Sequence, residues 1–290
     1  MKKRLFRFAV VALGLASLGA AVQQLDVPFV PTPREVVETM LAMADVKKGD
    51  VLYDLGCGDG RIVIMAAQKF GVKGVGVDLN PERIRESREN TAAAGVENLV
   101  TFIEGNIFDV EIKDASVVTL YLMSSVNLRL RPRLLRELRP GTRVVSHDFS
   151  MEDWKPDKFQ TVNGGYDNHY VYFWVIPANI SGVWDWTEKT ASGERRYVLD
   201  VTQKFQHFYG TVKADGLEEV PLTDVELAGD QVRFSAGFPV GGGLEVHRFE
   251  GKARGDTIEG AVSVEGAARA NRAAWRAVRR LGTAKAIDEE

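Results

Sequence analysis

Hydrophobic and polar positions are arranged differently in the two halves of this chain of 290 residues. In the first half, short apolar runs are separated by segments in which apolar residues recur with helical spacing. The runs span residues 51–55, 74–78, 99–103, 116–122, 141–149 and 169–176. Strands that alternate with helices predict a doubly wound α/β domain.

The second half follows a period of two. Apolar and polar residues alternate over 182–186, 196–201, 222–227, 231–234 and 244–249, and turn pairs such as Asp215-Gly216 and Gly229-Asp230 separate these segments. The pattern predicts an antiparallel β-meander, folded as a small barrel or a strongly curved sheet. A helical period is expected only at 267–281. We find no catalytic constellation here and expect this half to bind a substrate or a partner.

Three helices of the first half have recognisable starts. Residues 32–35, Thr-Pro-Arg-Glu, form a capping box before a helix over 33–44. Asn80 and Pro81 suit the N-cap and first position of another helix. The run 127–143 holds six arginines beside leucines spaced by four, and Pro132 predicts that its helix begins near that residue. Its arginine face is interpreted as solvated, with a contact for an acidic substrate surface or anionic lipid as the alternative.

A glycine-rich loop follows the first predicted strand. Gly56, Gly58 and Gly60 alternate with other residues, and the segment from Arg61 has helical periodicity. Such glycines let the backbone approach a ligand, and a helix N-terminus suits a carboxylate or phosphate. The spacing departs from the dinucleotide fingerprint Gly-x-Gly-x-x-Gly. Asp54 would repel a pyrophosphate but could accept hydrogen bonds from an ammonium group, which favours an amino-acid-like ligand.

Further polar residues follow the next two strands. Asp78 lies roughly 20 residues after the loop, where an acidic residue usually accepts a ribose hydroxyl. Asn106 follows the third strand; its carbonyl can accept a bond from an adenine amino group, and a plain turn asparagine is the equal alternative. Cys57 is the single cysteine, which excludes an intrachain disulfide and a cysteine metal site. It is interpreted as a small loop residue rather than a nucleophile.

Together these residues resemble the class I S-adenosylmethionine (SAM)-dependent methyltransferases, whose first motif is Asp/Glu-x-Gly-x-Gly-x-Gly. The resemblance spans residues 27–177. Segments 27–33, 54–63 and 141–149 are more narrowly similar to the small protein-lysine methyltransferases of archaea, bacteria and mitochondria. The resemblance implies a Rossmann-like fold, SAM as cofactor, and a cofactor site formed by Asp54, Gly56, Cys57, Gly58, Gly60, Asp78, Leu79, Asn106 and Ile107.

The same resemblance implies transfer of the SAM methyl group to a lysine of a protein substrate. Tyr121, at the end of the fourth strand, is the candidate for orienting the acceptor, and His147 is the second catalytic candidate. Asp148 and Thr32 are expected beside the substrate. The alternatives are methylation of a small molecule or lipid, and a non-catalytic exported binding protein on a methyltransferase-like scaffold.

The chain begins with basic residues and an apolar stretch. Lysines and arginines within 1–7 precede the uncharged residues 8–22, and the small residues at 19–21 offer a cleavage site, so a secretory signal peptide is predicted. The stretch approaches the roughly 17 residues that span a membrane, which makes an uncleaved anchor the alternative. The positive flank predicts a body on the periplasmic side, whereas the cytoplasmic origin of SAM favours the cytoplasmic face.

These patterns divide the chain into a signal peptide or anchor at 1–24, a methyltransferase domain at 25–178, a β domain at 179–282 and a polar tail at 283–290. The net charge of −3 gives no basis for nucleic-acid binding, because a DNA or RNA substrate usually brings a basic surface. No metal-ligand set is identified from the sequence.

Overall fold

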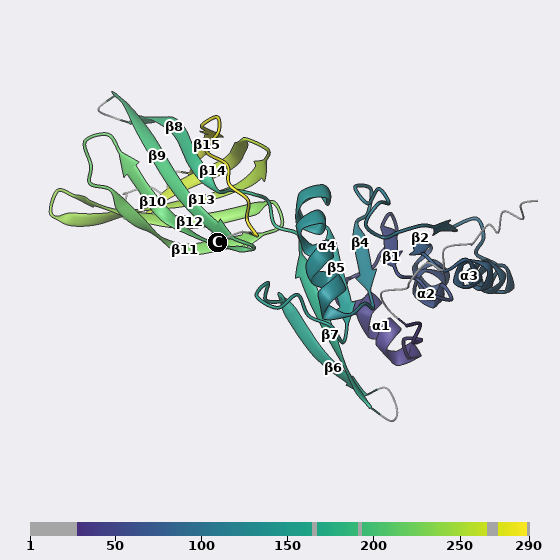
Figure 1. The fold of residues 1–290 in the computed structure, drawn as a ribbon. Coiled ribbons are helices and arrows are strands. Elements are labelled where there is room, and N and C mark those ends of the chain that lie inside the picture. Colours follow the sequence, from purple (N-terminus) through teal and green to yellow (C-terminus); the bar gives the residue numbers. More distant parts are fainter. Residues whose placement is uncertain (1–27, 164–166, 191–192, 266–271, 289–290) are drawn as a thin grey trace, which may run out of the picture.

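The computed structural model describes residues 28–163, 167–190, 193–265 and 272–288 (Figure 1). The predicted signal peptide or anchor at 1–24 lies outside these ranges. Among the described residues, no helix combines the length and the apolar character needed to cross a membrane.

The first half is a seven-stranded sheet in the order β3-β2-β1-β4-β5-β7-β6. The first five strands are parallel, and β7 runs antiparallel to both β5 and β6. The bounds are β1 Val51–Leu55, β2 Lys73–Asp78, β3 Val100–Glu104, β4 Val117–Leu120, β5 Arg143–His147, β6 Lys158–Asn163 and β7 Asn168–Val175. The predicted α/β class is confirmed. Strand β6 was not predicted from the sequence, because only Val162 is buried in it and its apolar signal is correspondingly weak.

Helices cover both faces of this sheet (Figure 1). Helices α1 (Arg34–Met43), α2 (Arg61–Phe70) and α3 (Pro81–Ala94) contribute buried residues to one core, and α4 (Ser124–Glu137) contributes to a second core on the opposite face. Helix α3 begins as predicted, because the Asn80 side chain accepts a hydrogen bond of 2.9 Å from the Glu82 N–H.

Two helix starts were predicted incorrectly. Helix α1 follows Pro33 without a side-chain cap, because the Thr32 hydroxyl contacts His147 Nδ1 at 3.2 Å instead of the helix backbone. Helix α4 begins at Ser124 and contains Pro132 in its interior. The buried side chains of Val126 and Leu130, which precede the proline, pack into the core and hold that part of the helix.

The arginine face of α4 is also not uniformly solvated. The Arg133 side chain is only 13% exposed and forms an ion pair with Glu137 at 3.0 Å. Its guanidinium donates to the carbonyl oxygens of Ile107 and Val110 in the loop after β3. Arg136, by contrast, is 68% exposed, as a solvated position should be. Arg133 therefore supports a loop of the first half.

The second half is a closed eight-stranded antiparallel barrel. This confirms the barrel alternative of the predicted meander. Its strands are β8 Gly182–Thr190, β9 Gly193–Lys204, β10 His207–Ala214, β11 Val220–Ala228, β12 Gln231–Val240, β13 Gly243–Arg254, β14 Thr257–Glu265 and β15 Arg272–Arg279. The helix predicted over 267–281 is wrong for its described part, which is β15. Trp275, Ala277 and Arg279 are buried on alternate positions, but alanine and arginine give this alternation little hydrophobic contrast.

A turn of the barrel inserts into the first half. Phe205, between β9 and β10, is 2% exposed and belongs to the same core as α4. Its ring stacks on Trp154 with 5.7 Å between centroids, and Trp154 Nε1 donates to Gln206 Oε1 at 2.8 Å. The predicted polar tail contributes as well, because Ile287 is 5% exposed and its carbonyl accepts a bond of 2.8 Å from Phe205 N–H. The barrel is thus packed against the α/β sheet.

Candidate functional site

The carboxyl ends of the parallel strands surround a cavity. It lies beside the neighbouring strands β1 and β4, where the strand order changes direction, which is the usual ligand position in open α/β sheets. The cavity has about 960 Å³ of space and opens to solvent. All the predicted cofactor residues except Gly60 line it. Gly60 is the N-cap residue of α2, with a φ of 80°.

The glycine loop is held in place by backbone hydrogen bonds. Gly56 N–H and Cys57 N–H both donate to the carbonyl of Val77, at 2.8 and 2.9 Å, and Gly58 N–H donates to Asp78 Oδ2 at 2.9 Å. Gly58 has a φ of 53°, and a Cβ there would overlap the ring of Phe29. The loop is therefore tied to the end of β2 and needs glycine at position 58.

Asp54 is a carboxylate inside the cavity wall. It is 2% exposed, and Thr119 Oγ1 donates to it at 2.8 Å. Burial raises the pKa of Asp54 to about 7, and the nearby Asp78 and Asp59 add to this, while the Thr119 hydrogen bond opposes it. The causes of this pKa shift include no cationic side chain, so a cationic group that enters the cavity would pair with Asp54 and stabilise its ionised form. Cys57 lies alongside, and burial raises the pKa of its thiol well above the usual range, as expected of an unreactive loop residue.

The next strand ends provide the other polar groups. Asp78 Oδ1 accepts a bond of 2.9 Å from Asn80 N–H, so both carboxylate oxygens are oriented by backbone groups. Asn106 lines the cavity, and its Oδ1 accepts a bond of 3.0 Å from Phe108 N–H. The turn role considered for Asn106 is therefore present in the structure.

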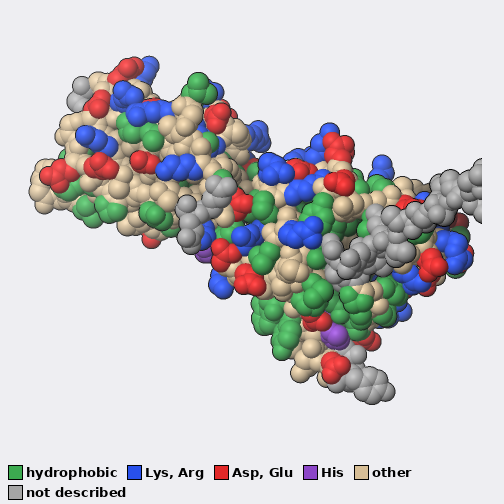
Figure 2. All heavy atoms as spheres, viewed as in Figure 1, with side chains coloured by type: hydrophobic (Ala, Val, Ile, Leu, Met, Phe, Trp, Pro, Cys, Tyr) green, Lys and Arg blue, Asp and Glu red, His purple; other side chains and the backbone are tan. Residues whose placement is uncertain are grey.

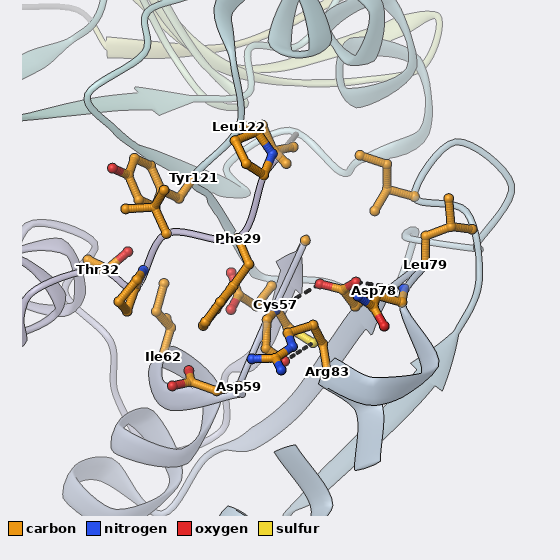
Figure 3. A pocket seen from close by; sticks show the side chains of 18 of the residues that line it. Phe29, Thr32, Cys57, Asp59, Ile62, Asp78, Leu79, Arg83, Tyr121 and Leu122 are labelled. Atoms are coloured by element: carbon orange, nitrogen blue, oxygen red, sulfur yellow. Dashed lines mark hydrogen bonds between the residues drawn. The ribbon is translucent and has the colours of Figure 1, made fainter. Parts of the chain in front are cut away.

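One wall of the cavity was not predicted from the sequence. Phe29 projects into the space between the glycine loop and Tyr121, and Arg83 lies beside it (Figure 3). The Arg83 guanidinium sits over the Phe29 ring, 4.7 Å from its centroid. Arg61 donates a bond of 2.9 Å to the carbonyl of Thr32, which ties the segment before α1 to the start of α2. The proline-rich segment that contains Phe29 was the available signal.

The predicted catalytic residues are adjacent, but only one faces the cavity. Tyr121 lines it, and its ring lies 3.8 Å from the His147 ring, centroid to centroid. His147 is fully buried behind Tyr121 and Thr32. Burial lowers the pKa of His147 to about 4, with Asp148 opposing and His169 adding to the shift. Burial, assisted by Asp148, raises the pKa of Tyr121, so its phenol stays protonated at neutral pH.

Asp148 lies on the outer side of this group. It follows β5 in the left-handed conformation, with a φ of 59° that is uncommon for a non-glycine residue. Its Oδ1 accepts a bond of 2.8 Å from Tyr170 N–H, and its Oδ2 lies 3.0 Å from His169 Nδ1. His169 was not identified from the sequence, although it begins a predicted strand. Antiparallel pairing of β5 with β7 brings it here.

Comparisons with known proteins identify similar methyltransferases. Residues 54–158 match the family model described as the ANTKMT methyltransferase domain. A protein-lysine N-methyltransferase of Saccharolobus islandicus (strain REY15A) is 51% identical over 151 residues, which cover 52% of this chain and 94% of that protein. The adenine nucleotide translocase lysine N-methyltransferase of Mus musculus is 33% identical over 150 residues, covering 51% of this chain and 64% of the relative.

A solved structure gives a similar match. The crystal structure of an RNA methyltransferase from Salinibacter ruber in complex with S-adenosyl-L-homocysteine is 53% identical. The match covers 52% of this chain and 96% of that chain, with a TM-score of 0.49. Each of these protein and structure matches covers about half of the present chain.

The cavity fits SAM as its cofactor. Asp54, a buried carboxylate with a raised pKa, suits the ammonium group of the cofactor's amino-acid portion. Asp78 at the end of β2 suits ribose hydroxyls, and apolar side chains such as Leu79 and Ile107 line the cavity beside it. Asp54, Asp78, Leu79, Asn106 and Ile107 would hold the cofactor.

Proposed function

The chain belongs to the class I SAM-dependent methyltransferases, in the family with the protein-lysine N-methyltransferases, and we propose that it methylates lysine side chains of a protein substrate. The observation that carries the proposal is the 51% identity to a protein-lysine N-methyltransferase over 94% of that relative. The methyltransferase activity belongs to the family; the lysine acceptor is our inference.

Bound SAM would supply an activated methyl group on a cationic sulfonium. The site must then bind the substrate lysine as a neutral amine, because a lysine ammonium has no free lone pair. Moving the amine from water into a partly buried site beside a cation lowers its pKa. The protein therefore acts mainly by positioning the amine and excluding water.

Tyr121 has the position needed to orient such an amine. It lies at the end of β4, lines the cavity, and keeps a protonated phenol whose oxygen can accept a hydrogen bond from the amine. His147 packs against its ring and would act as a positioning residue, since it is fully buried and does not line the cavity. Thr32 completes the group by its contact with His147 Nδ1.

The described part of the face seen in Figure 2 has a mixed charge rather than a basic patch. Figure 2 shows basic and acidic side chains interspersed over both halves on the face in view. The net charge of −3 agrees with this. A protein acceptor is compatible with such a mixed surface, whereas RNA or DNA binding usually relies on a basic patch.

The test is transfer of a labelled methyl group from SAM by the full chain. We expect label on a lysine-rich acceptor protein and none on the same protein after its lysines have been acetylated, with mass spectrometry locating the methyl group on lysine Nζ. Total RNA and a lipid extract are offered in parallel. Label that appears only on RNA, lipid or a small molecule would overturn the lysine assignment.

Two tyrosine variants separate catalysis from general effects. Tyr121→Phe should retain SAM binding and lower the transfer rate by roughly 10–100-fold, because it removes one orienting hydrogen bond and leaves the amine without that partner. Tyr209→Phe is the matched control, since Tyr209 lies in the barrel and is 69% exposed. Equal rates for the two variants would exclude Tyr121 from the reaction.

A further inference from the structure

Three side-chain atoms of the kind that bind metal ions converge behind Tyr121, which lines the cavity. They are His147 Nε2, His169 Nδ1 and Asp148 Oδ2, and the three distances between them are 2.9, 3.0 and 3.1 Å. Among the described residues, this is the group of histidine and acidic side chains whose atoms lie close enough together to hold a metal ion. None of its atoms is assigned a role in binding SAM.

Hydrogen bonds alone cannot satisfy this triangle. Each of its three edges would need its own proton, but each imidazole nitrogen carries at most one and the carboxylate brings none. If both nitrogens are protonated, both N–H groups can point to Asp148, and the two N–H groups then oppose each other at 2.9 Å. If one is protonated, two acceptors compete for a single proton. One close polar contact is unfavourable in every case.

A divalent cation would satisfy all three atoms at once. In an octahedral arrangement with metal–ligand bonds of about 2.1 Å, neighbouring ligand atoms lie about 3.0 Å apart. The observed edges match one triangular face of such an octahedron. Two histidines and one carboxylate on one face, with the remaining positions open, are typical of first-row transition ions, and imidazole ligands disfavour Mg²⁺ and Ca²⁺.

Groups around the triangle orient the ligands as metal sites require. Thr32 Oγ1 contacts His147 Nδ1 at 3.2 Å, so an Nδ1–H that donates to the hydroxyl leaves the Nε2 lone pair directed at the other two atoms. Tyr170 N–H holds the second oxygen of Asp148 at 2.8 Å. Hydrogen bonds of this kind fix the tautomer and orientation of metal ligands.

The burial of the ligands is graded toward solvent. The side chain of His147 is fully buried, whereas those of His169 and Asp148 are 17% and 23% exposed. An ion could therefore enter from the outer side and keep water in its open positions. We propose that His147, Asp148 and His169 form a binding site for one divalent first-row transition ion, which fixes the His147 ring against Tyr121.

The proposal is tested with Co²⁺ and Zn²⁺ on the full chain, prepared without a polyhistidine tag and stripped of metal by a chelator. We expect one Co²⁺ per chain with visible d–d absorption, displaced by Zn²⁺, and a higher Tm with Zn²⁺ than without. His169→Ala and Asp148→Asn should each weaken binding at least about tenfold, because loss of even an outer-shell partner costs about that much metal affinity. Asparagine is chosen because it tolerates the left-handed backbone at position 148.

The matched control is His207→Ala, since His207 is exposed in the barrel and far from the triangle in sequence. It should bind Co²⁺ as the unmodified chain does, and SAM binding by all variants shows that they are folded. Absence of binding by the unmodified chain would overturn the site. So would equal binding by His169→Ala, or weak binding of several ions that His207→Ala reduces, which would indicate an adventitious ion only.

Discussion

The two halves of this protein use β-structure in opposite ways. In the first half, five parallel strands end at the same edge of one sheet, and the polar residues that follow them surround an open cavity. In the second half, antiparallel strands close into a barrel whose core is built from aromatic side chains in mutual contact, among them Trp186, Phe234, Phe249 and Trp275.

This difference shows where chemistry can be placed in such a chain. The loops after parallel strands carry few backbone pairing constraints, so side chains such as Asp54, Asp78 and Tyr121 can converge there. Closing the barrel instead uses every strand edge for pairing and directs alternate side chains into the core. The barrel nevertheless contributes to the first half, because Phe205 is part of the core below α4.

The largest effect is expected from the residue that joins the halves. Phe205→Ala should lower the free energy of unfolding by about 3–5 kcal/mol, since it removes a ring that is 2% exposed and leaves a cavity beside Trp154. Urea denaturation followed by circular dichroism measures this. Tyr209→Ala, four residues further along and 69% exposed, should change stability by less than about 0.5 kcal/mol. Similar losses in both variants would show that the barrel does not support the α/β half.

A second comparison uses one glycine from each half. Gly58 and Gly255 have similar left-handed backbones, with φ of 53° and 58°, so alanine should cost each of them about 1–2 kcal/mol of backbone strain. At Gly58 the new Cβ also overlaps the Phe29 ring over the cavity, whereas Gly255 has open space around it. Isothermal titration should show SAM affinity reduced on the order of 10–100-fold for Gly58→Ala and unchanged for Gly255→Ala. Equal affinities would contradict the proposed role of the loop.

The smallest expected effect is the change in SAM affinity per pH unit. The pKa of Asp54 is raised to about 7, so this carboxyl is protonated below that pH and cannot pair with the cofactor's ammonium. Affinity should therefore fall by up to about tenfold per pH unit below pH 7 and level off above it. Titration calorimetry across this range measures the slope. Asp54→Asn should remove it, while Asp215→Asn in an exposed barrel turn should retain it.

Asp54 also affects the stability of the free protein. The folded free protein favours the protonated carboxyl, whereas SAM binding favours the ionised carboxylate. Because the folded-state pKa of Asp54 lies above its unfolded value of about 3.8, the folded chain binds more protons between these values, and its contribution to stability falls as the pH rises toward 7. Asp54→Asn should thus raise the Tm of the free protein above pH 7 while weakening SAM binding. An unchanged Tm would indicate that the ionised carboxylate is already paired.

Much of the α/β half was predictable because its signals are local. The strand before Gly56, the N-cap at Asn80 and the acidic end of β2 are each set by a few neighbouring residues, and all three appear as predicted. Errors occurred where distant contacts replaced local ones. Thr32 contacts His147 rather than capping α1, and packing of Val126 and Leu130 extends α4 to the N-terminal side of Pro132.

The amino-acid sequence by itself determined the α/β class, the alternation of the second half, and the residues of the glycine loop with Asp54 and Asp78. Only the tertiary structure decided that Phe29 covers Gly58, that Phe205 enters the first core, and that His169 meets His147 and Asp148. The reason is physical: a motif's spacing fixes groups that share one turn or one strand end. Contacts between segments far apart in the chain depend on how sheets pair and how cores are filled, and no local pattern records these.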